Sequence, residues 1–147
     1  MTNELDEKLC AKYPKIFAQR NLPMNQTAMC WGFDAGDGWY WLIDQLCSRI
    51  QSYIDSNPHL KIPQVEATQV KEKFAGLRFY INGGDDEIYG AIDLAEHMSY
   101  NICEVCGSTK DIGCTQGWLM TICKSCFDNS EPRIKDREWK ANNAGVA

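Results

Sequence analysis

The 147-residue sequence contains no stretch that approaches the roughly 18 consecutive apolar residues of a membrane-spanning helix. Its first residues also lack the basic segment and the following apolar segment of a secretion signal. These two absences predict a soluble, cytoplasmic protein with no membrane partner. Histidine is scarce as well: His59 and His97 are the only two, and neither belongs to a recognisable catalytic arrangement with a cysteine.

An excess of basic residues is also missing. The chain has 15 Lys and Arg against 20 Asp and Glu, a net charge of −5, which argues against a non-specific nucleic-acid binder. Residues 85–97 contain five acidic residues and no Lys or Arg, so this segment carries the whole excess and the rest of the chain is neutral. A local basic patch therefore remains compatible with the composition.

Cysteine, in contrast, is abundant, with eight residues. Without a secretion signal, this number favours reduced thiols that bind metal over a disulfide scaffold. Two C-x2-C pairs, Cys103 with Cys106 and Cys123 with Cys126, are separated by 16 residues. This spacing predicts a four-cysteine Zn²⁺ site that is structural, because four protein ligands leave no open position for water. The alternatives are buried thiols or a redox pair.

Hydrophobic periodicity predicts the other elements. A helix is expected within residues 3–18, interrupted at Pro14, and a longer amphipathic helix follows Asp37, which we expect to cap it. Alternation over residues 65–82 predicts a β-hairpin with an Ala75-Gly76 loop, and a second amphipathic helix begins at Asp85 or Asp86 and runs to the first cysteine pair.

The expected fold class is α+β, with two amphipathic helices packed on a small antiparallel β-hairpin sheet and a C-terminal zinc ribbon. The expected organisation is a helical and hairpin core over residues 1–102, the ribbon over 103–128, and a charged C-terminal tail over 129–147, whose last residues we expect to be mobile.

The Ala75-Gly76 loop would place apolar side chains, Phe74 among them, on one face of the hairpin. Lys71, Lys73, Arg78 and Tyr80 would then lie on the other face. In this register Lys73 stands opposite Arg78, an unfavourable pair unless an anion lies nearby. That anion is the chain's own acidic helix, or else a phosphate, a nucleic acid or an acidic partner. A three-residue loop would instead pair Glu72 with Arg78, but it would turn the two lysines to the apolar face.

Trp41 falls on the polar side of the long helix. A large aromatic residue there is either covered by another part of the chain, which we expect, or it anchors a partner.

Three motif strings, within residues 30–47, 69–80 and 103–107, together with Gly117-Trp118, resemble a family of small, largely uncharacterised proteins of tailed bacteriophages and prophages with a C-terminal four-cysteine zinc ribbon. The likeness covers about residues 28–126. It implies an accessory role directed at host machinery or host immunity.

The leading functional prediction is a non-enzymatic, zinc-stabilised binding module that engages a host protein or complex, a class that includes inhibitors of host defence. The candidate contacts are Trp41, Tyr80, Asp85, Asp86, Asp93 and Glu96. The alternative is nucleic-acid or nucleotide-phosphate binding by Lys71, Lys73 and Arg78, with Tyr80 as a stacking platform. An enzyme built on Asp34, Asp37 and Asp44 ranks last, because it lacks a paired base and nucleophile.

Overall fold

The computed structural model describes residues 1–142; the predicted mobile end of the tail, residues 143–147, lies outside them. The helices are α1 (Asn3–Lys12), α2 (Tyr40–Ser56), α3 (Asp86–Ser99), α4 (Lys124–Asp128) and α5 (Pro132–Lys135). The strands are β1 (Phe33–Asp34), β2 (Glu66–Lys73), β3 (Gly76–Asn82), β4 (Ile112–Thr115), β5 (Thr121–Cys123) and β6 (Trp139–Ala141). Over the described range, no helix combines the length and apolarity needed to cross a membrane.

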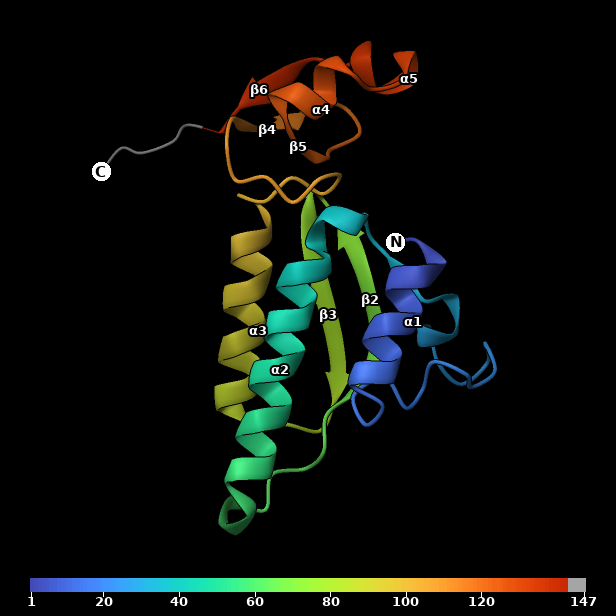
Figure 1. Cartoon of the computed structure of the whole chain (residues 1–147), viewed down its shortest axis with the longest axis vertical. Coiled ribbons are helices and arrows are strands. Elements are labelled where there is room, and N and C mark those ends of the chain that lie inside the picture. Colours follow the sequence, from blue (N-terminus) through green and yellow to red (C-terminus); the bar gives the residue numbers. More distant parts are fainter. Residues whose placement is uncertain (143–147) are drawn as a thin grey trace, which may run out of the picture.

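The α+β class is confirmed. The two predicted amphipathic helices are α2 and α3, the helix expected within residues 3–18 is α1, and two three-stranded sheets stand in place of one hairpin. The first sheet has the order β1-β2-β3, with β1 parallel and β3 antiparallel to β2, and the second has the order β5-β4-β6. In Figure 1, α1, α2 and α3 lie against the first sheet, and the second sheet with α4 and α5 forms a separate upper layer. Strand β1 was not predicted, because a strand of two residues is too short to show an alternating hydrophobic pattern.

The two long helices follow their predicted apolar stripes. Leu42, Ile43 and Ile50 of α2 are buried, and so are Ile88 and Ile92 of α3. They belong to one core that also takes in the apolar face of the first sheet. Burial of one stripe on each helix against the sheet provides most of the stability of such short elements.

The predicted cap of α3 is confirmed and that of α2 is wrong. Asp85 accepts a hydrogen bond from the backbone N–H of Ile88 at 3.1 Å. Asp37 instead lies in a 3₁₀ turn before α2, and its carboxylate accepts from the backbone N–H of Thr2 at 2.7 Å. The turn displaces the helix start to Tyr40, so Asp37 is too far from the first free N–H groups of α2 to cap them.

The hairpin register differs from both predicted registers. The observed partners are Lys73 with Gly76 and Lys71 with Arg78, so the loop is Phe74-Ala75. Gly76 serves packing and not the turn, because a Cβ there would collide with the ring of Tyr100. Arg78 is therefore paired with Lys71 and not with Lys73. Phe74, which was expected on the apolar face, lies in the loop and is exposed.

Helix α3 covers the outer edge of β3. The backbone N–H of Leu77 donates to Ser99 Oγ at 2.8 Å, and that of Phe79 donates to a carboxylate oxygen of Glu96 at 2.9 Å. Two N–H groups that would otherwise offer pairing sites to another strand are thus satisfied within the chain.

The predicted C-terminal tail contains two ordered elements. Residues 132–135 form α5, and β6 pairs with β4 through Gly113↔Ala141, Cys114↔Lys140 and Thr115↔Trp139. The second sheet thus extends beyond residue 128, the predicted end of the ribbon. Strand β6 has only three residues, which is too short to show an alternating pattern in the sequence. It is a strand because it pairs with β4.

The two loop residues Phe74 and Ala75 have φ values of 52° and 64°, as a two-residue type I′ hairpin loop requires. Left-handed backbone costs a non-glycine residue roughly 1–2 kcal/mol, and asparagine tolerates it best. We therefore expect Phe74→Asn to raise the free energy of unfolding by about 1 kcal/mol, measured by urea denaturation. Phe74→Val, with a β-branched side chain, should lower it; the opposite order would contradict the left-handed loop.

Candidate metal centre

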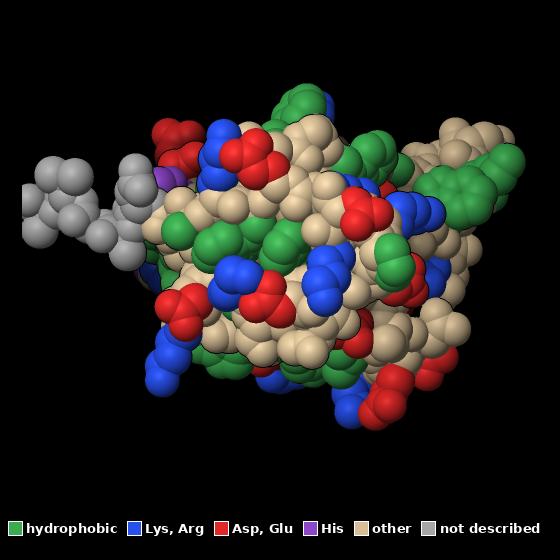
Figure 2. Space-filling view, turned by 90° about the horizontal axis from the view of Figure 1, so that it is seen from above, with side chains coloured by type: hydrophobic (Ala, Val, Ile, Leu, Met, Phe, Trp, Pro, Cys, Tyr) green, Lys and Arg blue, Asp and Glu red, His purple; other side chains and the backbone are tan. Residues whose placement is uncertain are grey.

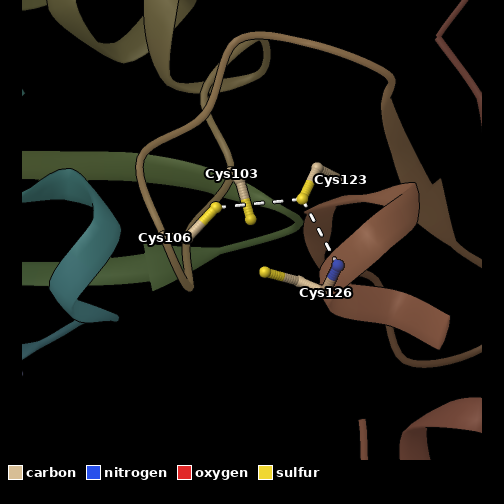
Figure 3. A group of neighbouring side chains, drawn as sticks. All are labelled: Cys103, Cys106, Cys123 and Cys126. Carbon is tan, nitrogen blue, oxygen red and sulfur yellow. Dashed lines mark hydrogen bonds between the residues drawn. The ribbon is translucent and has the colours of Figure 1, made fainter. Parts of the chain in front are cut away.

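The four predicted ligands come together. The Sγ atoms of Cys103, Cys106, Cys123 and Cys126 all lie within 4.8 Å of one another, and Figure 3 shows the four side chains converging from two segments of the chain. Cys103 and Cys123 are buried, whereas Cys106 is exposed. All four thiols are free, so the cluster is a possible metal site and not a pair of disulfides.

The first pair is held by a tight turn directly after α3. The N–H of Gly107 donates to the Cys103 carbonyl at 2.8 Å, and the N–H of Cys103 donates to the carbonyl of Ser108 at 2.8 Å. Gly107 has a φ of 76°, a left-handed conformation that glycine adopts without steric cost. The turn presents both sulfurs toward the second pair.

The second pair bridges a strand and a helix. Cys123 ends β5 and caps α4, accepting at Sγ a hydrogen bond from the N–H of Cys126 at 3.4 Å. Because β5 pairs with β4, and β4 follows the first turn, the hairpin carries the second pair back to the first. The β4–β5 hairpin is thus the connection that brings the two pairs together.

The donor set fits zinc. A tetrahedron with Zn–S bonds of about 2.3 Å has edges of about 3.8 Å, and Cys106 Sγ lies 3.8 Å from Cys123 Sγ. Burial raises the pKa of the Cys103 thiol. Burial and the neighbouring thiols together raise the pKa of Cys126. A cation is needed to hold all four sulfurs as thiolates, as metal binding requires.

Gly36 and Gly38, just before α2, let the turn that contains Cys103 and Cys106 pack closely against the core. A Cβ at Gly38 would collide with the Cys103 carbonyl, and one at Gly36 with the Glu104 carbonyl. The N–H of Gly38 donates to the Glu104 carbonyl at 2.8 Å. The Gly36-Asp37-Gly38 segment, read from sequence as a helix start, is thus the surface against which the turn with Cys103 and Cys106 packs.

Glu104, between the first two ligands, joins the layers and was not predicted. It is only 7% exposed, and its carboxylate accepts from the N–H of Gly36 at 2.9 Å. Its own N–H donates to the carbonyl of Thr121 at 3.0 Å. Burial, with a contribution from the nearby Glu72, raises the pKa of Glu104 to about 7. The sequence feature that could have pointed to this role is the position of an acidic residue between the two cysteines of a C-x2-C turn.

Hydrophobic burial in the upper layer is limited. Its buried cluster comprises two of the cysteines with Ile112, Ile122 and Phe127, and Trp139 packs against it, stacked on Phe127 at a centroid distance of 6.3 Å. So small a core rarely holds a fold by itself. The metal is therefore expected to contribute directly to folding of this layer.

The predicted partner contacts fall into three groups. Trp41 is 59% exposed, so the expected cover by the chain is wrong. Tyr80, Asp93 and Glu96 line one groove between β3 and α3. Asp85 caps α3 and accepts from the hydroxyl of Tyr53 at 3.1 Å, while Asp86 opens the helix at an exposed position.

The predicted basic face is divided. Lys71, Arg78 and Tyr80 do occupy one face of the hairpin, as the register requires. Arg78, however, donates to the hydroxyl of Tyr100 at 3.0 Å and lies 3.9 Å from a carboxylate oxygen of Glu96. The acidic helix therefore supplies an anion for Arg78. In the described part of the chain, the ion pairs do not include Lys71 or Lys73.

Comparison with models of protein families, with characterised proteins and with solved structures gives no match for this chain. Membership of the phage family is accordingly not shown.

Metal removal should loosen the upper layer first. We expect about one Zn²⁺ per chain by elemental analysis. After chelation, amide hydrogen exchange should accelerate across residues 103–142 before it does in α2, because the sheet there has little other core. Cys123→Ser should reproduce this effect, whereas Cys30→Ser, outside the cluster, should retain the metal. Unchanged exchange after chelation would refute a structural metal.

Loss of the Glu104 carboxylate should weaken the junction between the layers. Glu104→Ala leaves the N–H of Gly36 without its partner, at an expected cost of about 1–3 kcal/mol in the free energy of unfolding. Glu104→Gln keeps an acceptor oxygen and should cost less, and Glu7→Ala, on the exposed side of α1, should have little effect. Equal stabilities of the three variants in urea denaturation would contradict this assignment.

Proposed function

We propose that this protein is a non-enzymatic, zinc-stabilised binding module that engages another protein through Trp41. The exposure of Trp41 carries the proposal. A tryptophan that is 59% exposed on the polar side of a well-packed helix contributes little to the core. Tryptophan is among the residues most enriched at the energetic centres of protein interfaces.

The surroundings of Trp41 fit such a contact. It lines a hollow of about 330 Å³ together with Leu5, Tyr40 and Ile102, which supply an apolar floor. Cys106 and Gly107 of the metal-binding turn form another part of the wall. A partner side chain inserted beside Trp41 would therefore contact the turn itself, so binding through this hollow should require the metal.

The groove with Tyr80 supplies a second contact surface in this proposal. Tyr80 is 42% exposed and Tyr89, on α3, is 51% exposed. Both line a groove of about 530 Å³ whose charged members are Asp93 and Glu96. A partner with a basic segment complements this groove, since opposite charges steer association and fix its register.

Two of the three aspartates considered for catalysis have structural contacts. Asp37 binds the N–H of Thr2. Asp44 lies 2.7 Å from Lys12 Nζ and accepts from the hydroxyl of Tyr13 at 2.8 Å. Burial raises the pKa of Asp44, but these partners hold it below its ordinary value. These contacts account for both carboxylates without an enzymatic role.

The partner class follows from the resemblance to phage proteins, which points to a bacterial host protein or complex, including components of host defence. The proposed location is the bacterial cytoplasm. Affinity capture from a nuclease-treated bacterial lysate tests this, followed by binding measurements with the purified partner.

Trp41→Ala should weaken binding to that partner by about 2 kcal/mol or more, roughly 30-fold, because hot-spot residues lose this much on truncation. Trp31→Ala is the matched control, since Trp31 is 71% exposed and does not line the Trp41 hollow. Chelation should abolish binding as well. A partner that is retained equally by both variants, or only without nuclease, would overturn the proposal.

A further inference from the structure

We propose that a second groove, between the hairpin loop and the β4–β5 connection, binds single-stranded nucleic acid by stacking bases on Phe74 and Trp118. This site goes beyond the proposed function and shares no residue with the Trp41 hollow. It also differs from the basic face predicted from sequence, because Arg78 is engaged with α3.

The groove brings together two exposed aromatic rings from distant parts of the chain. Phe74 is 67% exposed and Trp118 is 73% exposed. Both line a hollow of about 380 Å³ that Lys71, Glu72 and Lys73 also border. Exposed aromatic rings beside cations are the usual elements of a single-strand site, where bases stack on the rings and cations contact the phosphates.

The backbone of Phe74 supports a role in binding. Its φ of 52° is a conformation that bulky side chains rarely adopt, and its ring is not buried. Neither turn preference nor core packing therefore favours phenylalanine at this position. Unfavourable backbone conformations retained without a packing reason are concentrated at functional sites.

Trp118 is carried on a loop whose backbone is fixed. The Thr115 hydroxyl donates to the Trp118 carbonyl at 2.7 Å, and the Arg137 guanidinium donates to the same carbonyl at 3.3 Å. The loop is thus held before a ligand arrives, which lowers the entropic cost of binding. Arg137 does not line the groove, but its guanidinium is a third cation in contact with this loop.

The charges favour a single-stranded polyanion. Lys73 Nζ lies 5.5 Å from the centre of the Phe74 ring, so cation and stacking surface are adjacent. The one acidic border residue, Glu72, accepts from the N–H of Ala75 at 2.6 Å. An acidic peptide would use the lysines but not the two rings, and a duplex keeps its bases out of reach of the rings.

Stacking should outweigh long-range attraction. The chain has a net charge of −5, and Figure 2, seen from above, shows acidic and basic side chains interspersed, with hydrophobic side chains exposed between them. With two or three phosphate contacts, affinity should fall roughly 7- to 18-fold between 50 and 200 mM salt, from a slope of about −0.7 per contact.

The test measures fluorescence anisotropy of labelled 12-nucleotide DNA and RNA of mixed sequence with the full-length, zinc-loaded protein. Trp118→Ala and Phe74→Asn should each weaken binding at least about fivefold, the lower bound for loss of one stacked base. Trp31→Ala should leave it unchanged. Because Phe74→Asn is expected to stabilise the fold, weaker binding by this variant cannot be ascribed to unfolding.

A second pair of variants isolates the charges. Lys71→Ala combined with Lys73→Ala should reduce the salt dependence of binding, whereas Lys110→Ala combined with Lys135→Ala removes the same charge elsewhere and should not.

Three outcomes would each overturn the proposal: no single-strand binding, equal binding of a duplex, or equal effects of Trp31→Ala and Trp118→Ala. Binding of a glutamate 12-mer with the same variant dependence, but not of single strands, would assign the groove to acidic peptides instead. None of these outcomes depends on Trp41.

Discussion

The close seating of the Cys103–Gly107 turn on the Gly36-Asp37-Gly38 segment is the constraint on which the rest of the structure depends. The turn supplies two of the four sulfurs, and its backbone contacts the start of the long helix with no room for a side chain between them. The N–H groups of Gly36 and Gly38 both donate to Glu104, so hydrogen bonding and close approach act at the same place. The position of the four-cysteine cluster and the position of α2 are consequently fixed by the same contacts.

Trp39 and Asn142 extend this junction. The Trp39 indole N–H donates to the Ile102 carbonyl at 2.9 Å, and the Asn142 amide donates to the Tyr100 carbonyl at 2.7 Å. Thr121 Oγ1 donates to the carbonyl of Ala75, so the hairpin loop is attached as well. The Trp41 hollow and the Phe74–Trp118 groove both lie along this junction, each with one wall from either layer. Their shapes depend on how the layers meet, so no single stretch of sequence contains both walls of either surface, although Trp41, Lys71 and Lys73 were candidate contacts.

The sequence was most informative where the signal is local. The cysteine spacing, the stripes of α2 and α3 and the Asp85 cap each depend on residues a few positions apart, and each was predicted. Strands β1 and β6 escaped prediction because two or three residues become a strand only through pairing with β2 or β4. The hairpin register was wrong because Gly76 was read as a turn residue, whereas the ring of Tyr100, 24 positions later, requires it. Glu104 and the exposure of Trp41 likewise depend on tertiary contacts.

The order of strands in the second sheet has a consequence for how this layer can come apart. Its central strand, β4, pairs with β5 on one side and with β6 on the other. All four sulfurs lie on or before α4, so the cysteine cluster and the β4–β5 hairpin contain no residue of β6. Strand β6 can therefore detach from the edge of the sheet without loss of any of the four sulfurs. Its detachment would remove Trp139 from Phe127 and break the contact between Asn142 and Tyr100.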